Sequence, residues 1–278
     1  MLAAIEKRMS LYHRITEKLQ FFTPDFYKER YFKHLKNISR ENYSERNIEP
    51  ELIWIKDYLP RNAVMIDIGA NVGSFLYQLE RKLSPQNIFA FEPNRKLYMR
   101  LKRIFPRVHI YPLALSDRNE TADFKIPVIK GKAYDSRGTL QLNYRENGEA
   151  KHFFQQVKVI KLDDWAGLES MKKIDFIKID VEGNEMHTLR GAKKVIKQYR
   201  PTLMVEMEQR HHQEPLQKMI SEIESWDYGT FFLNRKTFEL EQLNENIIAD
   251  LSQKVPGSKE EYINNMIFIP KQPKNYGA

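Results

Sequence analysis

Short apolar runs that end in an acidic residue recur along the first three quarters of the chain, at residues 64–67, 87–92, 174–180 and 202–206. Unbroken apolar runs of this length are typical of strands buried on both faces of a parallel sheet. A helix is predicted over residues 184–197, because apolar residues recur there at helical spacing: Met186, Leu189, Ala192 and Ile196. The pattern therefore predicts an α/β fold with a mostly parallel sheet.

The middle of the chain is less regular. Residues 108–115 predict a third strand that Pro112 interrupts, since proline cannot donate a hydrogen bond within a sheet. Residues 123–129 and 153–162 predict the strands of a hairpin or meander. The polar segment 130–151 between them is long for a loop inside a compact domain, which suits either a functional lid or a plain surface insertion. As an acceptor-recognition loop it would offer Tyr134, Arg137 and Tyr144.

Further elements are predicted after this loop. Asp163 and Asp164 can cap a short helix, because a carboxylate accepts hydrogen bonds from the first amides of a helix. Residues 215–226 predict another helix. Two more strands are predicted, at residues 230–233 and 265–269.

Residues 1–46 predict a helical extension ahead of one large domain at residues 47–278. Apolar residues follow a helical stripe at its start: Leu2, Ile5, Met9, Tyr12, Ile15, Leu19 and Phe22. A second group follows Pro24: Phe26, Tyr27, Tyr31, Phe32 and Leu35. Such stripes usually pack on a core, here the large domain or a second subunit. The alternatives are contact of a basic, aromatic face with an anionic membrane surface or with nucleic acid.

The charge balance is basic, with 45 Lys and Arg against 37 Asp and Glu, a net of +8. Half of this excess lies in residues 1–46, which hold ten basic and six acidic residues. The absence of cysteine excludes disulfides, thiol catalysis and cysteine-based zinc sites. Neither a signal peptide nor an apolar stretch of the roughly 20 residues that cross a membrane is evident, so a cytoplasmic protein is expected.

Asp67 begins the pattern Asp67-x-Gly69-x-Asn71-x-Gly73, in which acidic or small residues occupy every second position. Ala70 lies between Gly69 and Asn71. Glycine can adopt positive φ and leaves room for a ligand, so this pattern predicts a strand, a tight turn that contacts a ligand, and a helix. The dinucleotide motif G-x-G-x-x-G has no acid before it, which disfavours a dehydrogenase. Asp67 would repel a pyrophosphate and suits a cation, such as the ammonium of a methionine moiety. An ordinary strand–helix turn is the alternative.

A second acid, Glu92, lies 19 residues beyond Gly73 and is followed by Pro93. An acid about 20 residues past such a turn, at the tip of the second strand, is placed to accept hydrogen bonds from ribose hydroxyls. Pro93 ends the strand and can begin the next helix. A glutamate that merely caps this helix is the alternative, but two acids in register favour a nucleoside site.

Four acids thus stand at the ends of predicted strands: Asp67, Glu92, Asp180 and Glu206. Ligands bind at strand ends in open parallel sheets, so four successive acids indicate one site. Glu182 and the pair His211-His212 follow closely after the last two. A divalent ion held by Asp180, Glu206 and His211 is an alternative that the sequence disfavours, because no compact ligand motif such as H-E-x-x-H is present.

The ordered set IDIGANVG, FAFEP, LALSD, KIDVEGNE and PTLMVEME, between about residues 64 and 208, resembles the FkbM-type family of S-adenosylmethionine-dependent methyltransferases. The resemblance implies a Rossmann-like class I fold, with a mostly parallel seven-stranded sheet, a reversed last strand and helices on both faces. It implies that the methionine part of S-adenosylmethionine is surrounded by Asp67, Gly69, Ala70, Asn71 and Gly73. It places Glu92 and Pro93 at the ribose, Ser116 and Asp117 beside the adenine, and Asp180 at the sulfonium and the acceptor.

Methyl transfer from a sulfonium requires alignment of the acceptor and exclusion of water, and a hydroxyl acceptor also benefits from a base. The candidate bases, in order, are Asp180, His211, Glu182 and Glu206. We therefore expect O-methylation of a sugar, a glycan or a glycosylated metabolite. A methyltransferase for RNA or another macromolecule is less favoured, since no clustered basic run or Asn-Pro-Pro-Tyr motif is present. A non-catalytic cofactor-binding scaffold is less favoured because all four acids are intact.

Overall fold

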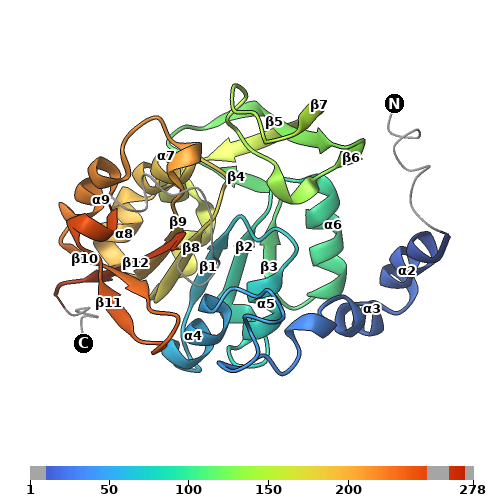
Figure 1. The fold of residues 1–278 in the computed structure, drawn as a ribbon, viewed down its shortest axis with the longest axis horizontal. Helices are drawn as coiled ribbons and strands as arrows, with labels where there is room; N and C mark the ends of the chain where they lie inside the picture. The colour runs from blue at the N-terminus through green and yellow to red at the C-terminus, as the bar shows by residue number, and fades with distance from the viewer. Residues whose placement is uncertain (1–10, 249–262, 273–278) are drawn as a thin grey trace.

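A computed structural model describes residues 11–248 and 263–272, with side chains from residue 16 onward. Its centre is an eight-stranded sheet of order β11-β10-β12-β9-β8-β1-β2-β3 (Figure 1). The bounds of its strands are β1 Met65–Ile68, β2 Ile88–Phe91, β3 His109–Tyr111, β8 Phe176–Ile179, β9 Thr202–Glu206, β10 Tyr228–Leu233, β11 Leu240–Gln242 and β12 Asn265–Pro270.

The strand directions confirm the predicted class I arrangement. Strands β3, β2, β1, β8 and β9 are parallel neighbours, and β12 is antiparallel to both β9 and β10. The chain winds outward from β1 to β3 and then returns to β8 on the other side of β1, so the strand order reverses beside β1. Strand β11 is an eighth strand that the sequence pattern does not predict, because it is short and lacks an apolar run.

Helices cover both faces of this sheet, as the pattern of burial along the strands requires. Met65 belongs to a hydrophobic cluster with α4 (Glu51–Tyr58), α5 (Ser74–Leu79) and α6 (Arg95–Ile104). Its neighbour Ile66 points to the other face, because successive side chains of a strand alternate. There it packs in a second cluster with α7 (Glu185–Arg190), α8 (Lys193–Tyr199) and α9 (Leu216–Glu224).

The middle of the chain forms a second sheet of order β4-β7-β5-β6. The predicted hairpin is confirmed, because β5 (Glu120–Ile129) and β7 (Glu149–Ile160) pair in antiparallel fashion. Strand β6 (Lys132–Ala133) lies in the segment between them. The prediction of one interrupted strand over residues 108–115 is wrong: Pro112 separates β3 from β4 (Leu113–Leu115), which belongs to the second sheet.

Two other local predictions need correction. The helix predicted over residues 184–197 breaks into α7 and α8 near Gly191, where a Cβ would lie 1.9 Å from the carbonyl oxygen of Ser116. Asp163 lies within the short 3₁₀ helix η5 (Leu162–Asp164) and does not cap a helix that begins immediately after it. Its carboxylate accepts hydrogen bonds from the amides of Lys194 and Val195, so it caps α8.

The N-terminal segment comprises α2 (Leu11–Phe22), α3 (Pro24–Tyr31) and the 3₁₀ turn η2 (Lys33–Leu35). Phe32 is fully buried, its ring stacked at 4.7 Å on Tyr77 of α5 and 5.9 Å from Phe105. By contrast, Phe22 and Phe26 are 80% and 60% exposed. The predicted stripe positions Leu2, Ile5 and Met9 lie outside the described residues. Among the helices of residues 11–248, none is long and apolar enough to cross a membrane.

Candidate functional site

The turn after β1 brings the main chain against the end of β8. Gly69 has φ +79°, and a Cβ at this position would lie 1.8 Å from the carbonyl oxygen of Asp180. Gly73 has φ +92°, and a Cβ there would lie 2.7 Å from Leu101 and 2.8 Å from Phe105. Both positions therefore require glycine, the first for a backbone contact beneath the site and the second for packing of α5 against α6.

Glu92 is directed back at this turn. It is buried, and its two carboxylate oxygens accept hydrogen bonds from the amides of Asn71 at 2.7 Å and Asn94 at 2.8 Å. Burial raises the pKa of Glu92 to about 8, although these two hydrogen bonds oppose the rise. The side chain of Asn94 caps α6 by accepting hydrogen bonds from its first amides. Asn94 is thus the cap of α6, and Glu92 contacts this helix end through the amide of that cap residue.

Two cavities adjoin at the turn, because Gly69, Asn71 and Asp180 line both of them. The first cavity continues over the end of β2 and under the loop that follows β6, and its lining includes Glu92, Pro93, Leu113, Ala114, Leu115, Asp135, Ser136, Val181 and Glu182. The second cavity opens toward the N-terminal segment, and its lining includes His34, Leu35, Glu49, Ala70, Ser74, Phe75 and Lys178.

Four of the residues expected at the cofactor lie outside these linings: Asp67, Gly73, Ser116 and Asp117. Ser116 is buried against Gly191, and Asp117 pairs with His187 at 2.8 Å near the surface, so the first cavity is lined by the preceding residues of β4 instead. Asp67 is 1% exposed and lies beneath the turn.

Lys178, which the sequence patterns do not single out, holds the acids of β1 and β8 together. It is the register partner of Asp67, and its ammonium lies 3.5 Å from Asp67 and 3.1 Å from Asp180. Burial opposes its charge, but Asp180 and Asp67 raise the pKa of Lys178 above its usual value. Burial raises the pKa of Asp67, against the influence of Lys178. The one signal that could have found Lys178 is its spacing, because it lies two residues before Asp180 and so faces the same side of the strand.

Asp180 and Glu206 are adjacent across the ends of β8 and β9, and each affects the pKa of the other. A hydrogen bond joins their side chains, and Asn264 donates a second one to Glu206 at 2.6 Å. Burial opposes the charge of Asp180, but Lys178 lowers the pKa of this carboxyl below its usual value. Burial and the charge of Asp180 raise the pKa of Glu206 well above its usual value. The two shifts run in opposite directions, so the negative charge is favoured on Asp180 and the protonated form is favoured on Glu206.

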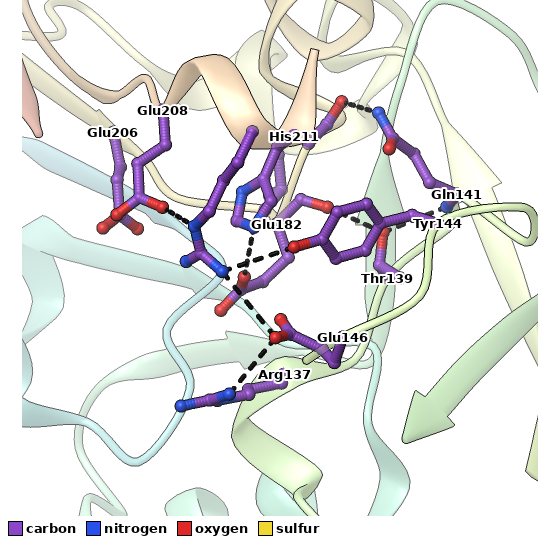
Figure 2. Close-up of polar contacts among 12 residues, drawn as sticks. Arg137, Thr139, Gln141, Tyr144, Glu146, Glu182, Glu206, Glu208 and His211 are labelled. Carbon is purple, nitrogen blue, oxygen red and sulfur yellow. Dashed lines mark hydrogen bonds and ion pairs between the residues drawn. The ribbon is translucent and has the colours of Figure 1, made fainter. Parts of the chain in front are cut away.

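A second polar cluster lies beside this pair and comprises Glu146, Glu182 and His211 (Figure 2). One potential ligand atom from each residue lies within 4.8 Å of the others. His211 belongs to the 3₁₀ turn η7 (Gln209–His211) that follows β9, and Glu182 follows β8 with φ 51°. The metal set considered from the sequence was different: the structure groups His211 with Glu146 and Glu182, not with Asp180 and Glu206.

The loop at residues 130–151 provides the other side of this cluster. Thr139 donates a hydrogen bond at 2.7 Å to the carbonyl oxygen of Glu182. Tyr144 packs its ring edge-to-face against His211 at 4.9 Å. Arg137 forms an ion pair with Glu146 at 3.2 Å. The sequence pointed to this loop and to Tyr144 and Arg137, but it held no local signal for Glu146.

Burial sets the protonation states within the cluster. It raises the pKa of Glu182 to about 8, helped by the nearby charges of Asp180, Glu185 and Glu146. Burial also lowers the pKa of His211, and Arg210 lowers it further. The imidazole is therefore neutral at neutral pH, and its Nε2 is buried without a hydrogen-bond partner.

Comparison with known proteins identifies the family. The model of the methyltransferase FkbM domain matches residues 67–230. The AMB antimetabolite synthetase AmbE of Pseudomonas aeruginosa is 28% identical over 188 residues, which cover 56% of this chain and 9% of AmbE. The 2-O-methyltransferase NoeI of Sinorhizobium fredii is 28% identical over 142 residues, which cover 48% of this chain and 58% of NoeI.

Among solved structures, the methyltransferase FkbM from Methylobacillus flagellatus aligns with 75% of this chain and 44% of its own, at 17% sequence identity and a TM-score of 0.46. This chain spans less than two thirds of the length of AmbE, NoeI or that structure. The domain match covers more than half of the sequence, from Asp67 at the end of β1 through to β10. The chain therefore belongs to the FkbM methyltransferase family.

Proposed function

We propose that this protein transfers a methyl group from S-adenosylmethionine to a hydroxyl group of a sugar, a glycan or a glycosylated metabolite. The observation that carries the proposal is the position of Asp180 at the edge common to both cavities, where Lys178 lowers the pKa of its carboxyl and the pKa of the neighbouring Glu206 is raised. The family membership supports methyl transfer, and the name of NoeI, a 2-O-methyltransferase, supports a hydroxyl acceptor.

The residues of the turn suit this cofactor. The side-chain oxygen of Asn71 is buried without a hydrogen-bond partner at the edge shared by the cavities, where it can accept from the ammonium of the methionine moiety. Glu92 lines the first cavity and keeps lone pairs for ribose hydroxyls beyond its two amide contacts. Lys178 and Asp67 would support the turn from beneath rather than contact the cofactor.

The chemistry divides simply between cofactor and protein. S-adenosylmethionine supplies a methyl carbon on a positively charged sulfur, and the sulfur keeps the bonding electron pair as the acceptor oxygen takes the methyl group. Asp180 orients the acceptor hydroxyl and accepts its proton, since its carboxylate is ionised and faces the cavities. The loop at residues 130–151 covers the first cavity, where its Ser136 carbonyl accepts from Asn71 at 3.2 Å, so it would exclude water.

Calorimetric titration with S-adenosylhomocysteine, with NADH as the rival ligand, tests the cofactor. We expect saturable binding of S-adenosylhomocysteine alone. Incorporation of labelled methyl groups into a panel of sugars and glycans then tests the acceptor. Failure of the folded protein to bind S-adenosylhomocysteine, or binding of NADH instead, would contradict the proposal.

The variant Asp180→Asn tests the role of the carboxylate. The amide cannot accept the proton, so we expect turnover to fall at least about 100-fold while affinity for S-adenosylhomocysteine changes little. Asp57→Asn, at an exposed position on α4, is the matched control and should leave both quantities unchanged. Near-normal turnover of Asp180→Asn would remove Asp180 from this role.

A further inference from the structure

We infer that Glu146, Glu182 and His211 form a binding site for a divalent metal ion. The three residues come from three separate segments: the loop at residues 130–151, the end of β8 and the turn η7. Their potential ligand atoms lie within 4.8 Å of one another. Two ligands of one ion, each about 2.0–2.3 Å from it, lie up to about 4.6 Å apart, so small side-chain adjustments bring all three into its reach.

His211 is the observation that points to a ligand. Its side chain is 6% exposed, and its Nε2 atom is buried without a hydrogen-bond partner. That atom faces the Glu182 carboxylate at 3.8 Å, beyond hydrogen-bond distance (Figure 2). A buried imidazole nitrogen that lacks a partner carries a desolvation cost, which coordination of a metal ion would relieve. The edge-to-face contact with Tyr144 fixes the ring plane in this direction.

The surroundings of the cluster favour a cation. Glu182 is close to Asp180, Glu185 and Glu146, so several carboxylates crowd one buried region. Arg137 and Arg210 approach the same oxygen of Glu146, Oε2, at 3.2 Å and 3.7 Å. These two contacts orient the Glu146 carboxylate, as residues around metal ligands commonly do. Arg210 is also engaged by Glu208 and by the hydroxyl of Tyr144.

The ligand set and its position indicate what the ion would do. Two carboxylates and one imidazole suit Mn²⁺ or Zn²⁺, and three protein ligands leave positions open for a substrate. Glu182 also lines the first cavity, two residues after Asp180. An ion here would bind two neighbouring hydroxyls of the acceptor and lower the pKa of the one that reacts, a role that rests on the proposed function.

Metal binding can be tested without cofactor or acceptor. The purified chain is treated with a chelator, dialysed and titrated with MnCl₂ and with ZnCl₂. We expect one saturable site, weakened about tenfold or more in both Glu182→Gln and His211→Gln. The control His187→Gln alters an exposed histidine that pairs with Asp117, and it should bind as the original chain does. Thermal unfolding of each variant shows that it is folded.

Absence of saturable binding, or equal binding by the original chain and both variants, would overturn the site. Its role has a separate test, in which methyl transfer is measured on metal-free protein. Loss of transfer that Mn²⁺ restores, with S-adenosylhomocysteine binding unchanged, would support the role. Full transfer by metal-free protein would overturn the role and leave the proposed function standing.

Discussion

At the scale of single residues, the stability of the site depends on the lysine that compensates the charge of its buried acids. Among the residues that the structure describes, Lys178 alone forms ion pairs with both Asp67 and Asp180, from a position that is almost fully buried. Removing one partner of a buried ion pair leaves the other charge without compensation in a medium that solvates it poorly. Asp67, Lys178 and Asp180 thus form one group of linked ion pairs, which connects β1 with the end of β8.

The variant Lys178→Met tests this unit. Methionine fills a similar volume but leaves the two carboxylates unpaired, so we expect the free energy of unfolding to fall by about 3–5 kcal/mol. Urea denaturation measures the change. Lys172→Met, at an exposed position six residues earlier, is the control and should change stability little. Equal stability of the two variants would mean that Lys178 does not neutralise the site.

The raised pKa of Glu92 predicts a dependence of stability on pH. Its pKa is about 8 in the folded chain, against an ordinary value of 4.5, with burial as the main cause and Asp67 and Asp180 as nearby charges. Folding therefore favours the protonated form, and this contribution to stability is lost as the pH rises from about 4.5 to about 8.

The variant Glu92→Gln cannot ionise, so its free energy of unfolding should fall less steeply than that of the original chain over this range. Denaturation at several pH values measures the two slopes. The absolute stability is less informative, because the NH₂ group of glutamine would face a backbone amide that now donates to a carboxylate oxygen. Parallel slopes for both proteins would contradict the assigned pKa.

At the scale of elements, two steric effects fix the turn after β1: a left-handed backbone and a close contact with the end of β8. Comparing substitutions at two glycines distinguishes these effects. Gly69 and Gly131 have nearly the same φ, +79° and +75°, but only Gly69 has a neighbour where its Cβ would be. Alanine at Gly131 should cost about 1–2 kcal/mol for the left-handed backbone alone. Gly69→Ala should cost clearly more and abolish S-adenosylhomocysteine binding, since the turn must move away from the Asp180 carbonyl.

Thermal unfolding and calorimetry of the two variants provide the comparison. Equal destabilisation would mean that the contact with the end of β8 imposes no constraint. Retained binding by Gly69→Ala would show that the turn does not shape the cavities.

The same elements show what a sequence can predict. Strands β1, β2, β8 and β9 are largely buried on both faces, so their apolar runs are nearly continuous, and an acid lies within or directly after the last two residues of each strand. The split between β3 and β4 depends on pairing with β7, more than 40 residues later, and no local pattern encodes that. Glu146 lies near His211 because two segments that are distant in the sequence converge in the fold. No local sequence pattern could therefore predict that Glu146 belongs to the candidate site.

At the scale of the whole molecule, the N-terminal segment packs on the sheet domain through three buried side chains, Tyr27, Phe32 and Leu35. Phe32 is fully buried in the cluster that also contains residues of α4, α5 and α6. Phe32→Ala should lower the free energy of unfolding by about 3–5 kcal/mol, as is usual for a large cavity in a core. Phe26→Ala is the control, because Phe26 is 60% exposed. Urea denaturation distinguishes them, and similar values would show that the segment adds little to the fold.

The contact of Phe32 with Phe105 has a consequence for ligand binding. Phe105 also packs on Gly73, and His34 and Leu35, just beyond Phe32, line the second cavity. Docking of the segment and occupation of the cavity are therefore linked equilibria, and each must favour the other by the same factor. A bound ligand would protect residues 23–36 from proteolysis. Conversely, cleavage in this segment would lower the affinity for the ligand.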